Sequence, residues 1–407
     1  MKWLDDIGIT APLGFMAAGM HAGIKRKKLD LGLITTEQPC PVAAVYTTNV
    51  VQAGCIKVTK AHLANNRAQA IIVNSGNANA CTPNGTSDAF AMCKGVAEAL
   101  EINADDVVVA STGIIGVPLP LEKIEKAMPK LVEKLDAGLE VDSNFASAIM
   151  TTDLTLKQAA CSIEIDGKEI LIAGVAKGSG MIHPNMATML AFITTDVAIT
   201  PSLLQKALSE VTEPTFNSIS VDGDTSTNDM SVAMASGAAG NLCIDCENEA
   251  YNSFKKALKE VCLVLAKKIA EDGEGATKLI TCVVDGCQTE ADAKAISMSV
   301  NASSLVKTAM TGSDANWGRV LCAMGYSGIC FDPQAVDVAF ASKAGVITVC
   351  QDGAGLEFDE TQATTILSEK EVTININIKT AGHNATWTTY GCDLTNEYVR
   401  INGDYGS

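Results

Sequence analysis

Aromatic residues are scarce in this sequence, at 4% of 407 residues, although hydrophobic residues as a whole make up 47%. Alanine, valine, isoleucine, leucine and methionine must therefore fill the cores. A chain of this length is long enough for two or three domains, each with a core of its own. The composition indicates a globular protein.

Positive charge is also in short supply, since the net charge is -17 and the pI is about 4.7. Nucleic-acid binding needs a concentrated basic face, so the composition argues against nucleic acid as a partner. The densest basic run is Lys25-Arg26-Lys27-Lys28. It is bracketed by apolar and acidic residues, and we expect a solvated turn there rather than a binding patch.

No apolar run approaches the length that crosses a bilayer, and the N-terminal stretch, with Asp5 and Asp6, does not resemble a signal peptide. The fourteen cysteines are diluted over a long chain and favour reduced thiols in a reducing compartment, so we expect a cytoplasmic protein with no membrane contact. Four of them are predicted to lie in apolar core segments: Cys55, Cys262, Cys282 and Cys322. The single C-x-x-C, Cys243 to Cys246, offers too few ligands for structural zinc, and no metal is predicted.

The pattern of strands and helices predicts a mixed α/β fold with domains that are interleaved along the chain. Strands are predicted at 42–48, 56–59, 70–73 and 107–110, with a polar loop at 74–79 and a hairpin that turns at Asp166-Gly167. Helices are predicted from Thr86 or Ser87, which would cap the helix, to Leu100, then at 121–135, after 200–202, and at 252–270. The first helix is expected to bury Phe90, Cys93, Val96 and Leu100.

The stretch from Gly174 to Ala191 is the leading candidate for the functional centre. It joins a glycine-rich turn that contains Lys177, a Pro184-Asn185 corner, and an Ala187-Thr188 bond that enters an apolar run. A threonine delivered by such a loop can act as a nucleophile if a nearby group takes its proton. The alternative is that Thr188 is only a β-branched residue opening a buried segment.

Three other features carry polar groups that suit a site. A predicted strand ends in Thr112-Gly113, where a hydroxyl and free N–H groups could hold an oxyanion, although such turns are common. The loop 220–229 is dense in carboxylates and hydroxyls, which either satisfy turn backbone or support a site. Glu274 lies between two glycines and is predicted to be exposed on a flexible turn, either as an ordinary solvated acid or as a holder of a substrate amine.

Taken together, nine segments in order make the whole chain resemble the ornithine acetyltransferase/N-acetylglutamate synthase family of arginine biosynthesis. The segments are Gly19–Lys25, Ser75–Asn79, Ser111–Gly116, Met150–Asp153, Lys177–Met189, Val221–Asp229, Asp272–Thr277, Asn316–Arg319 and Val399–Asn402. The resemblance implies an α/β sandwich with two central sheets between helical layers, of the autoprocessing N-terminal-nucleophile type. It also implies an α2β2 heterotetramer of processed chains.

In that family the chain cuts itself at the Ala-Thr bond, which corresponds here to Ala187-Thr188. The products would be an α chain, 1–187, and a β chain, 188–407. The freed α-amine of Thr188, with an unperturbed pKa of about 7.7–8.0, could then accept the proton of its own hydroxyl. No histidine is then needed as a base, and His183 is expected to be loop structure.

The implied reaction is ping-pong transfer of acetyl from N2-acetylornithine to Thr188 and then to glutamate. Thr112 and Gly113 match the oxyanion-hole positions. The substrate-lining positions are matched by Lys177, Thr188, Glu274, Asn402 and Ser407, and by Thr151 or its neighbour Thr152. Glu274 is expected to face the ornithine side-chain amine, and Lys177 and Asn402 a carboxylate. Ser407 stands where many relatives have threonine. No cofactor is implied, and the use of acetyl-CoA as a donor is left open.

Two other readings make different predictions. An autoprocessing aminopeptidase or amidase would use the same nucleophile with water as acceptor, but it has no need of the Glu274 loop or of the Arg400-Ile401-Asn402 segment. A non-catalytic binding protein would keep the Ala187-Thr188 bond intact and would form no acetyl-enzyme.

Overall fold

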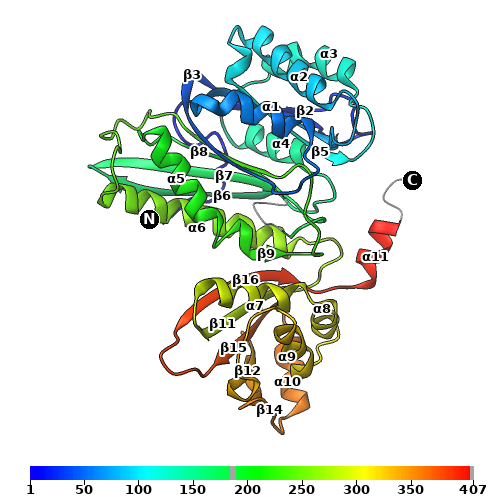
Figure 1. The fold of residues 1–407 in the computed structure, drawn as a ribbon. Helices are drawn as coiled ribbons and strands as arrows, with labels where there is room; N and C mark the ends of the chain where they lie inside the picture. The colour runs from blue at the N-terminus through cyan, green and yellow to red at the C-terminus, as the bar shows by residue number, and fades with distance from the viewer. Residues whose placement is uncertain (184–188, 404–407) are drawn as a thin grey trace. The chain divides into compact units, whose positions relative to one another are not determined.

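The computed structural model describes residues 1–183 and 189–403, which form two compact units (Figure 1). Each unit is assembled from three stretches of the chain. Unit 1 consists of Met1–Gly178, Pro184–Asn217 and Asp224–Leu265, and unit 2 of Ser179–His183, Ser218–Gly223 and Ala266–Ser407. The chain therefore passes from one unit to the other several times.

Unit 1 is built around a nine-stranded mixed sheet, in the order β1-β6-β7-β8-β10-β3-β4-β5 with β2 beside β3. Its strands are β1 (Lys2–Trp3), β2 (Phe15–Met20), β3 (Leu31–Tyr46), β4 (Arg67–Asn77), β5 (Val107–Ile114), β6 (Lys157–Ile165), β7 (Lys168–Lys177), β8 (Leu190–Thr195) and β10 (Met230–Ala235). β4 runs parallel to β5 and β8 parallel to β10, whereas β6, β7 and β8 are antiparallel neighbours. The central strands are buried along their length and rich in Val, Ile and Ala, as expected for strands covered on both faces.

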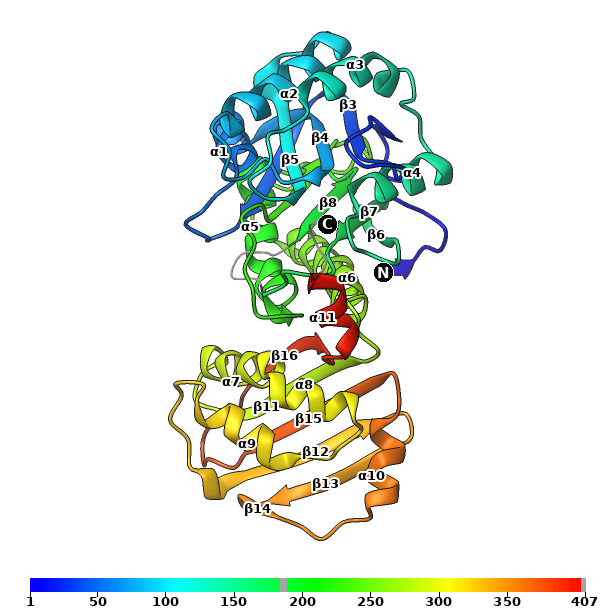
Figure 2. The same ribbon diagram turned by 90° about the vertical axis from the view of Figure 1, so that its right-hand side faces the viewer.

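Helices cover this sheet (Figures 1 and 2). They are α1 (Gly54–His62), α2 (Gly85–Leu100), α3 (Leu121–Val132), α4 (Leu139–Ile149) and α5 (Pro201–Thr212), and α6 (Glu249–Glu271) begins in unit 1 and ends in unit 2. α1 and α2 pack against β5, α3 packs against α2, and α4 packs against β2 and β3. The polar ends of β4, β5 and β7 are thereby held on a rigid support.

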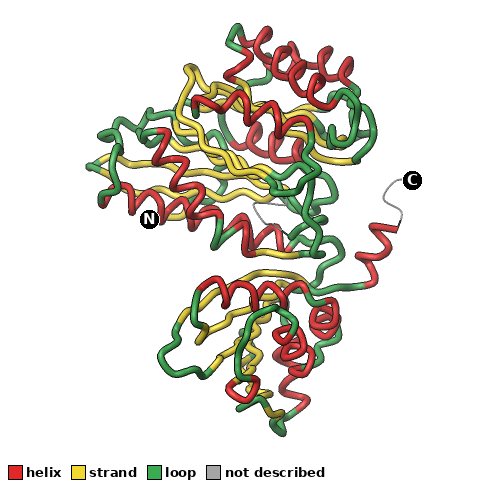
Figure 3. The backbone as a smooth tube through the Cα atoms, viewed as in Figure 1, coloured by secondary structure: helices red, strands yellow, loops and turns green. Residues whose placement is uncertain are grey.

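Unit 2 contains a seven-stranded sheet in the order β14-β13-β12-β15-β11-β16-β9. Strands are drawn in yellow and helices in red in Figure 3. The strands are β9 (Ile219–Ser220), β11 (Leu279–Cys287), β12 (Val336–Ser342), β13 (Gly345–Gln351), β14 (Ala354–Gly355), β15 (Glu371–Ile378) and β16 (Ala385–Cys392). The helices are α7 (Glu290–Ala302), α8 (Ser304–Thr311), α9 (Trp317–Gly325), α10 (Glu360–Leu367) and α11 (Asn396–Gly403). α7 packs against β11 and β16, whereas α11 has no buried side chain.

The prediction of a mixed α/β fold with two sheets flanked by helices is confirmed. The hairpin at Asp166-Gly167 is also confirmed: both residues have positive φ, 52° and 71°, as a two-residue turn between twisted strands requires. The helices predicted near 121–135, after 200–202 and at 252–270 correspond to α3, α5 and α6, and Pro129 lies inside α3.

The strand predicted at 56–59 is wrong, because these residues form the middle of α1. Their β-branched content favours a strand, but Cys55, Ile56 and Thr59 are fully buried where α1 packs against α2 and β5. Packing between distant segments thus overrides a weak local preference.

The polar loop predicted at 74–79 is also wrong for its first four residues. Residues 74–77 complete β4, because Ser75 and Gly76 pair with Thr112 and Gly113 of the parallel strand β5. The first predicted helix begins at Gly85 without a side-chain cap from Thr86 or Ser87. Phe90 is 47% exposed, so it does not belong to the buried face on which Cys93 and Val96 lie.

The fourteen cysteines are all free thiols, and most of them are buried, as predicted. Cys322 is the exception among the four expected in the core, since it lies on an exposed part of α9. None of the helices within residues 1–183 and 189–403 combines the length and the apolar character needed to cross a membrane.

Candidate active site

Lys177 and the Thr112-Gly113 pair lie together at strand ends in unit 1. Lys177 is the last residue of β7, and Thr112 and Gly113 are near the end of β5. The Lys177 Nζ donates a hydrogen bond of 3.2 Å to the Thr112 Oγ1. Because this bond uses the hydroxyl oxygen as an acceptor, the single hydroxyl hydrogen of Thr112 is left to donate elsewhere. A hydroxyl polarised in this way suits the stabilisation of a developing negative charge.

Gly113 can occupy its position only because it has no side chain. Its φ is 137°, and a Cβ placed on it would lie 2.3 Å from the carbonyl carbon of Gly76 on the neighbouring strand. β4 and β5 therefore approach each other closely where Gly76 pairs with Gly113, the position at which an oxyanion donor is expected.

A fully buried ion pair supports the end of β7. The Asp153 Oδ1 accepts hydrogen bonds from the Lys157 Nζ at 2.8 Å and from the Gly178 N–H at 2.7 Å, and its Oδ2 accepts from the Thr151 N–H at 2.9 Å. The Asp153 and Lys157 side chains are both 0% exposed. Burial alone would raise the pKa of Asp153, but the ammonium groups of Lys177 and Lys157 hold it well below its usual range. Asp153 is therefore an anion that joins the 151–157 turn to the point where β7 ends.

A second buried carboxyl group in unit 1, that of Asp229, has a pKa shifted in the opposite direction. Burial raises its pKa well above the usual value, against the lowering effect of Lys177. Its neighbour Asn228 donates to the Ala78 carbonyl at 2.6 Å and to the Ser111 carbonyl at 2.9 Å. This end of the 220–229 loop thus supports the strand that carries Thr112.

Glu274 and Asn402 lie together in unit 2. The Asn402 Nδ2 donates to the Glu274 Oε2 at 2.7 Å, and the Glu274 N–H donates to the Ser179 carbonyl at 2.9 Å. Glu274 is only 7% exposed, so the prediction of an exposed acid on a flexible turn is wrong. Sequence alone misses this because the carboxylate is covered by Gly180, on which a Cβ would lie 2.4 Å from the Glu274 carboxyl, and by Asn402.

The chain before residue 184 is held in unit 2 by Asp222. Its carboxylate accepts the N–H groups of Met181 at 2.6 Å and Ile182 at 2.8 Å, and it also accepts from the Tyr398 hydroxyl at 3.2 Å. His183 contacts the Ser220 Oγ through its Nδ1 at 3.0 Å, a contact that fits a structural role. The other end of the 220–229 loop therefore fixes the segment that leads to the Ala-Thr bond.

Three of the predicted site residues, Ala187, Thr188 and Ser407, lie outside the described residues. Thr151 and Thr152 are both half-buried in the turn that follows α4. Thr151 contributes its N–H to Asp153, and the choice between these two threonines as a substrate contact stays a prediction.

Sequence reasoning missed Asp153 and Lys157 as part of this framework. A lysine that opens an apolar strand, Lys157 of β6, was the available signal, but its partner becomes evident only when the ends of β6 and β7 meet. Within residues 1–183 and 189–403, no three His, Cys, Asp or Glu side chains gather as metal ligands.

Comparison with known proteins gives matches over the whole chain. A model of the ArgJ family matches residues 16–407. The arginine biosynthesis bifunctional protein ArgJ of Caldanaerobacter subterraneus subsp. tengcongensis is 48% identical over 406 residues, which cover all of both chains. The arginine biosynthesis bifunctional protein ArgJ 1 of Clostridium acetobutylicum is 48% identical over 413 residues, which cover 100% of this chain and 99% of that protein.

A solved structure is similar to part of the chain. The crystal structure of the arginine biosynthesis bifunctional protein ArgJ of Bacillus halodurans is 46% identical, with a TM-score of 0.50. The match covers 99% of that chain and 53% of this one.

Proposed function

This chain belongs to the ArgJ family, and we propose that it transfers the acetyl group of N2-acetylornithine to glutamate in arginine biosynthesis. The observation that carries the proposal is the contact between Lys177 and Thr112 beside Gly113, which joins an ammonium group, a hydroxyl and a strand end suited to an oxyanion. It brings together, within one unit, three residues that the motifs singled out separately.

The reaction begins when the Thr188 hydroxyl attacks the acetyl carbonyl carbon of N2-acetylornithine. The α-amine of Thr188 accepts the hydroxyl proton, and the Thr112 hydroxyl and the Gly113 N–H donate to the oxyanion. The carbon–nitrogen bond then breaks, the proton passes to the leaving amine, and ornithine departs. The acetyl group remains on Thr188 as an ester.

In the second half-reaction the amine of glutamate attacks the ester carbonyl. The same donors stabilise the second oxyanion, the Thr188 oxygen leaves and takes back a proton, and N-acetylglutamate is released. Lys177 binds a carboxylate of each substrate, whereas Glu274, oriented by Asn402, binds the side-chain ammonium of acetylornithine. No metal or organic cofactor is required, since one residue supplies both nucleophile and base.

The nucleophile arises by cleavage of the Ala187-Thr188 bond, which gives an α chain of residues 1–187 and a β chain of residues 188–407. The Bacillus halodurans match supports two chains. A β chain starting at Thr188 has 220 of the 407 residues, or 54%, and the solved chain, matched over 99% of its length, covers 53% of ours. We further propose that the chains assemble as an α2β2 heterotetramer in the cytoplasm.

Intact-protein mass spectrometry tests the proposal, before and after brief mixing with N2-acetylornithine. Two chains divided between residues 187 and 188, with one acetyl group on the chain that begins at Thr188, are expected. An uncut chain that gains no acetyl group would indicate a binding protein. Loss of the acetyl group to water as fast as to glutamate would indicate a hydrolase. A separate assay with acetyl-CoA and glutamate decides whether acetyl-CoA is a second donor.

A further inference from the structure

Lys25 differs from the rest of its basic run. Arg26, Lys27 and Lys28 are exposed, as a solvated turn requires, but Lys25 is half-buried in unit 1. The prediction of a solvated turn is therefore wrong for this one residue. The proposed reaction assigns no role to Lys25.

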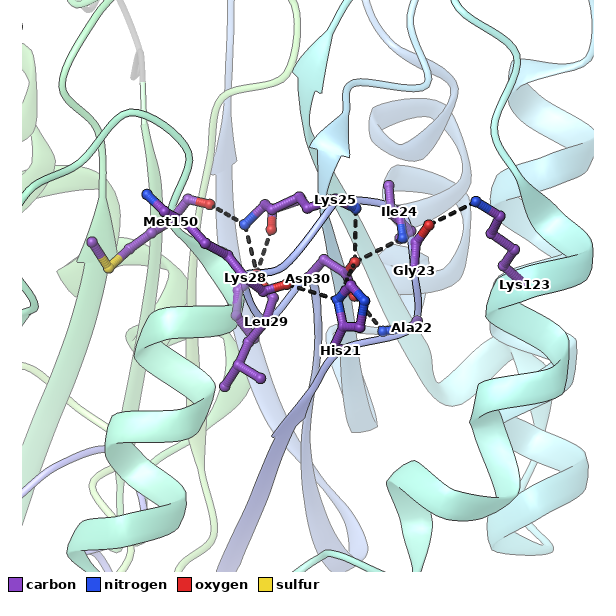
Figure 4. A network of polar contacts seen from close by, with 12 residues as sticks. His21, Ala22, Gly23, Ile24, Lys25, Lys28, Leu29, Asp30, Lys123 and Met150 are labelled. Atoms are coloured by element: carbon purple, nitrogen blue, oxygen red, sulfur yellow. Dashed lines mark hydrogen bonds and ion pairs between the residues drawn. The ribbon is translucent and has the colours of Figure 1, made fainter.

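The loop that carries Lys25 is fixed by the fully buried Asp30 (Figure 4). Its carboxylate accepts the N–H groups of Ala22 at 2.5 Å, Ile24 at 2.7 Å and Lys25 at 2.8 Å, and it lies 3.3 Å from the His21 ring. The carboxylate nearest in sequence is thus committed to the main chain of the loop. It fixes the position of Lys25 without pairing with its ammonium group.

The ammonium group of Lys25 has only carbonyl partners. It donates to the Leu29 carbonyl at 2.9 Å and to the Met150 carbonyl at 2.6 Å (Figure 4). An ammonium group has three hydrogens, and in the described part of the chain no carboxylate forms an ion pair with this one. One hydrogen of this partly buried cation therefore has no acceptor among residues 1–183 and 189–403, and a ligand carboxylate could accept it.

The position of Lys25 is beside the residues of the transferase chemistry. A Cβ placed on Gly76 would lie 2.9 Å from the Lys25 Cγ, so the side chain lies against Gly76, whose main chain pairs with Gly113. Its carbonyl partner Met150 directly precedes Thr151. Lys25 therefore belongs to the same part of unit 1 as the Lys177–Thr112 contact.

The charges in this part of unit 1 do not balance. Three lysines, Lys25, Lys157 and Lys177, interact with Asp153, and Asp30 is the other carboxylate that acts on Lys25. Burial raises the pKa of Asp229, which favours its uncharged form. Burial lowers the pKa of Lys25 to about 8, with Lys28 and Lys177 acting in the same direction and Asp30 and Asp153 against it. An excess of partly buried positive charge favours the binding of an anion.

The two proposed substrates differ in their number of carboxylates. Acetylornithine has one, and glutamate has two. Lys177 accounts for the carboxylate that both share, so a second cation beside the same strand ends suits the carboxylate that only glutamate carries. On the basis of the proposed function, we propose that Lys25 binds the side-chain carboxylate of the acceptor and thereby determines the choice of glutamate.

The test separates the two half-reactions in the processed wild-type enzyme and in Lys25→Gln. Acetylation by N2-acetylornithine, followed by mass spectrometry, is expected to stay within about twofold of wild type. The kcat/KM for glutamate in the second half-reaction is expected to fall about 10- to 100-fold, mainly through KM, as for loss of a hydrogen bond to a charged group. The preference for glutamate over glutamine is expected to fall by a similar factor.

Lys123→Gln is the matched control. The Lys123 ammonium also donates to a carbonyl of this loop, that of Gly23 at 2.7 Å, but Lys123 is exposed and lies on α3. It is expected to leave both half-reactions unchanged, which separates loss of the Lys25 charge from general loosening of the loop.

Equal losses in both half-reactions of Lys25→Gln, or no loss in either, would overturn the proposal. If Lys25→Gln does not fold, the wild-type enzyme still decides, because acceptance of glutamine and glutamate with equal kcat/KM contradicts a carboxylate-binding lysine. Failure of the wild-type enzyme to become acetylated would instead contradict the proposed transferase function itself.

Discussion

The two clusters of candidate site residues are supported in different ways. In unit 1, Thr112, Gly113 and Lys177 lie at the ends of paired strands and rest on the buried Asp153–Lys157 pair. In unit 2, Glu274 follows the end of α6, and Asn402 comes from α11, a helix with no buried side chain. Strand register thus fixes the first cluster, whereas polar contacts hold the second.

The clusters also differ in the sign of their charge. The side chain proposed to bind substrate charge is an ammonium group in unit 1, that of Lys177, and a carboxylate in unit 2, that of Glu274. If the proposed substrate contacts are right, the two kinds of charged group on the substrates are recognised by different parts of the fold. A change at Lys177 in unit 1 should affect both substrates through the carboxylate that they share, and a change at Glu274 in unit 2 should affect only the substrate with a side-chain amine.

The largest expected effect comes from removing the support of the unit 1 cluster. Asp153→Ala, made in a Thr188→Ala background that keeps the chain uncut, is expected to lower the free energy of unfolding by about 3–5 kcal/mol, because Lys157 stays buried without a counter-ion. Urea unfolding measures this.

Asp142→Ala is the control for that experiment. Asp142 is also buried, but its partners are not charged: it accepts from the N–H and hydroxyl of Thr10, at 2.9 and 2.8 Å, and from the Gly8 main chain. The lost hydrogen bonds are expected to cost about 1–3 kcal/mol. Equal costs for the two variants would show that the ion pair has no special part in supporting unit 1. Adding Lys157→Met to Asp153→Ala should restore part of the loss.

The next effect concerns catalysis by unit 1. Lys177→Met removes both the carboxylate partner and the donor to Thr112, and it is expected to lower the rates of both half-reactions by about 100-fold, or about 3 kcal/mol. Single-turnover measurements with N2-acetylornithine and then with glutamate test this. A loss of rate confined to one half-reaction would contradict the proposal that Lys177 binds the carboxylate that both substrates carry.

A smaller and more selective effect is expected in unit 2. Glu274→Gln keeps the shape of the side chain but removes its charge, and it should lower kcat/KM for N2-acetylornithine by about 10- to 100-fold, with little change for glutamate in the second half-reaction. Glu271→Gln, an exposed acid three residues earlier, is the control and should change neither value. If Glu274→Gln bound N2-acetylornithine with the affinity of the wild type, the role assigned to Glu274 would be wrong.

The smallest effect is a dependence of stability on pH that comes from unit 1. The pKa of Lys25 is lowered from 10.5 to about 8 in the folded protein, so between these values the unfolded chain binds the extra proton. Stability contributed by this group therefore rises with pH from about 8 to 10.5. Because solvent screens a partly exposed ammonium group, we expect about 1 kcal/mol.

This pH dependence is measured as the difference in unfolding free energy between the Thr188→Ala protein and the same protein carrying Lys25→Gln. The difference removes the contributions of other titrating groups. A difference that stays constant between pH 8 and 10.5 would show that burial does not disfavour the charged form of Lys25.

Sequence reasoning succeeded where the signal is local. The Asp166-Gly167 hairpin and helices α3, α5 and α6 follow from turn chemistry and periodicity within a few residues. The order of the motifs was also sufficient to identify the family, because a motif can be recognised in the sequence without knowledge of the structure around it.

The sequence did not predict features that depend on contacts between distant segments of the chain. Ile56 lies in a helix because α1 packs on α2 and β5, and Ser75 lies in a strand because β5 pairs with it. Glu274 is buried because Asn402, 128 residues later, donates to it. The half-buried position of Lys25 depends in the same way on Gly76 and Met150. Nothing in the sequence of the basic run therefore distinguishes Lys25 from the exposed residues that follow it.

The antiparallel pairing of β7 with β8 determines what self-cleavage does to the molecule. β7 ends at Lys177 and β8 begins at Leu190, and these two residues are partners in the ladder between the strands. A cut between residues 187 and 188 therefore leaves one sheet whose hydrogen bonds are shared by two polypeptides. Neither product could complete that sheet alone, because each would expose the unpaired edge of a buried strand. If the proposed cleavage takes place, folding is expected to precede it, and the two halves made as separate polypeptides are expected to aggregate rather than assemble.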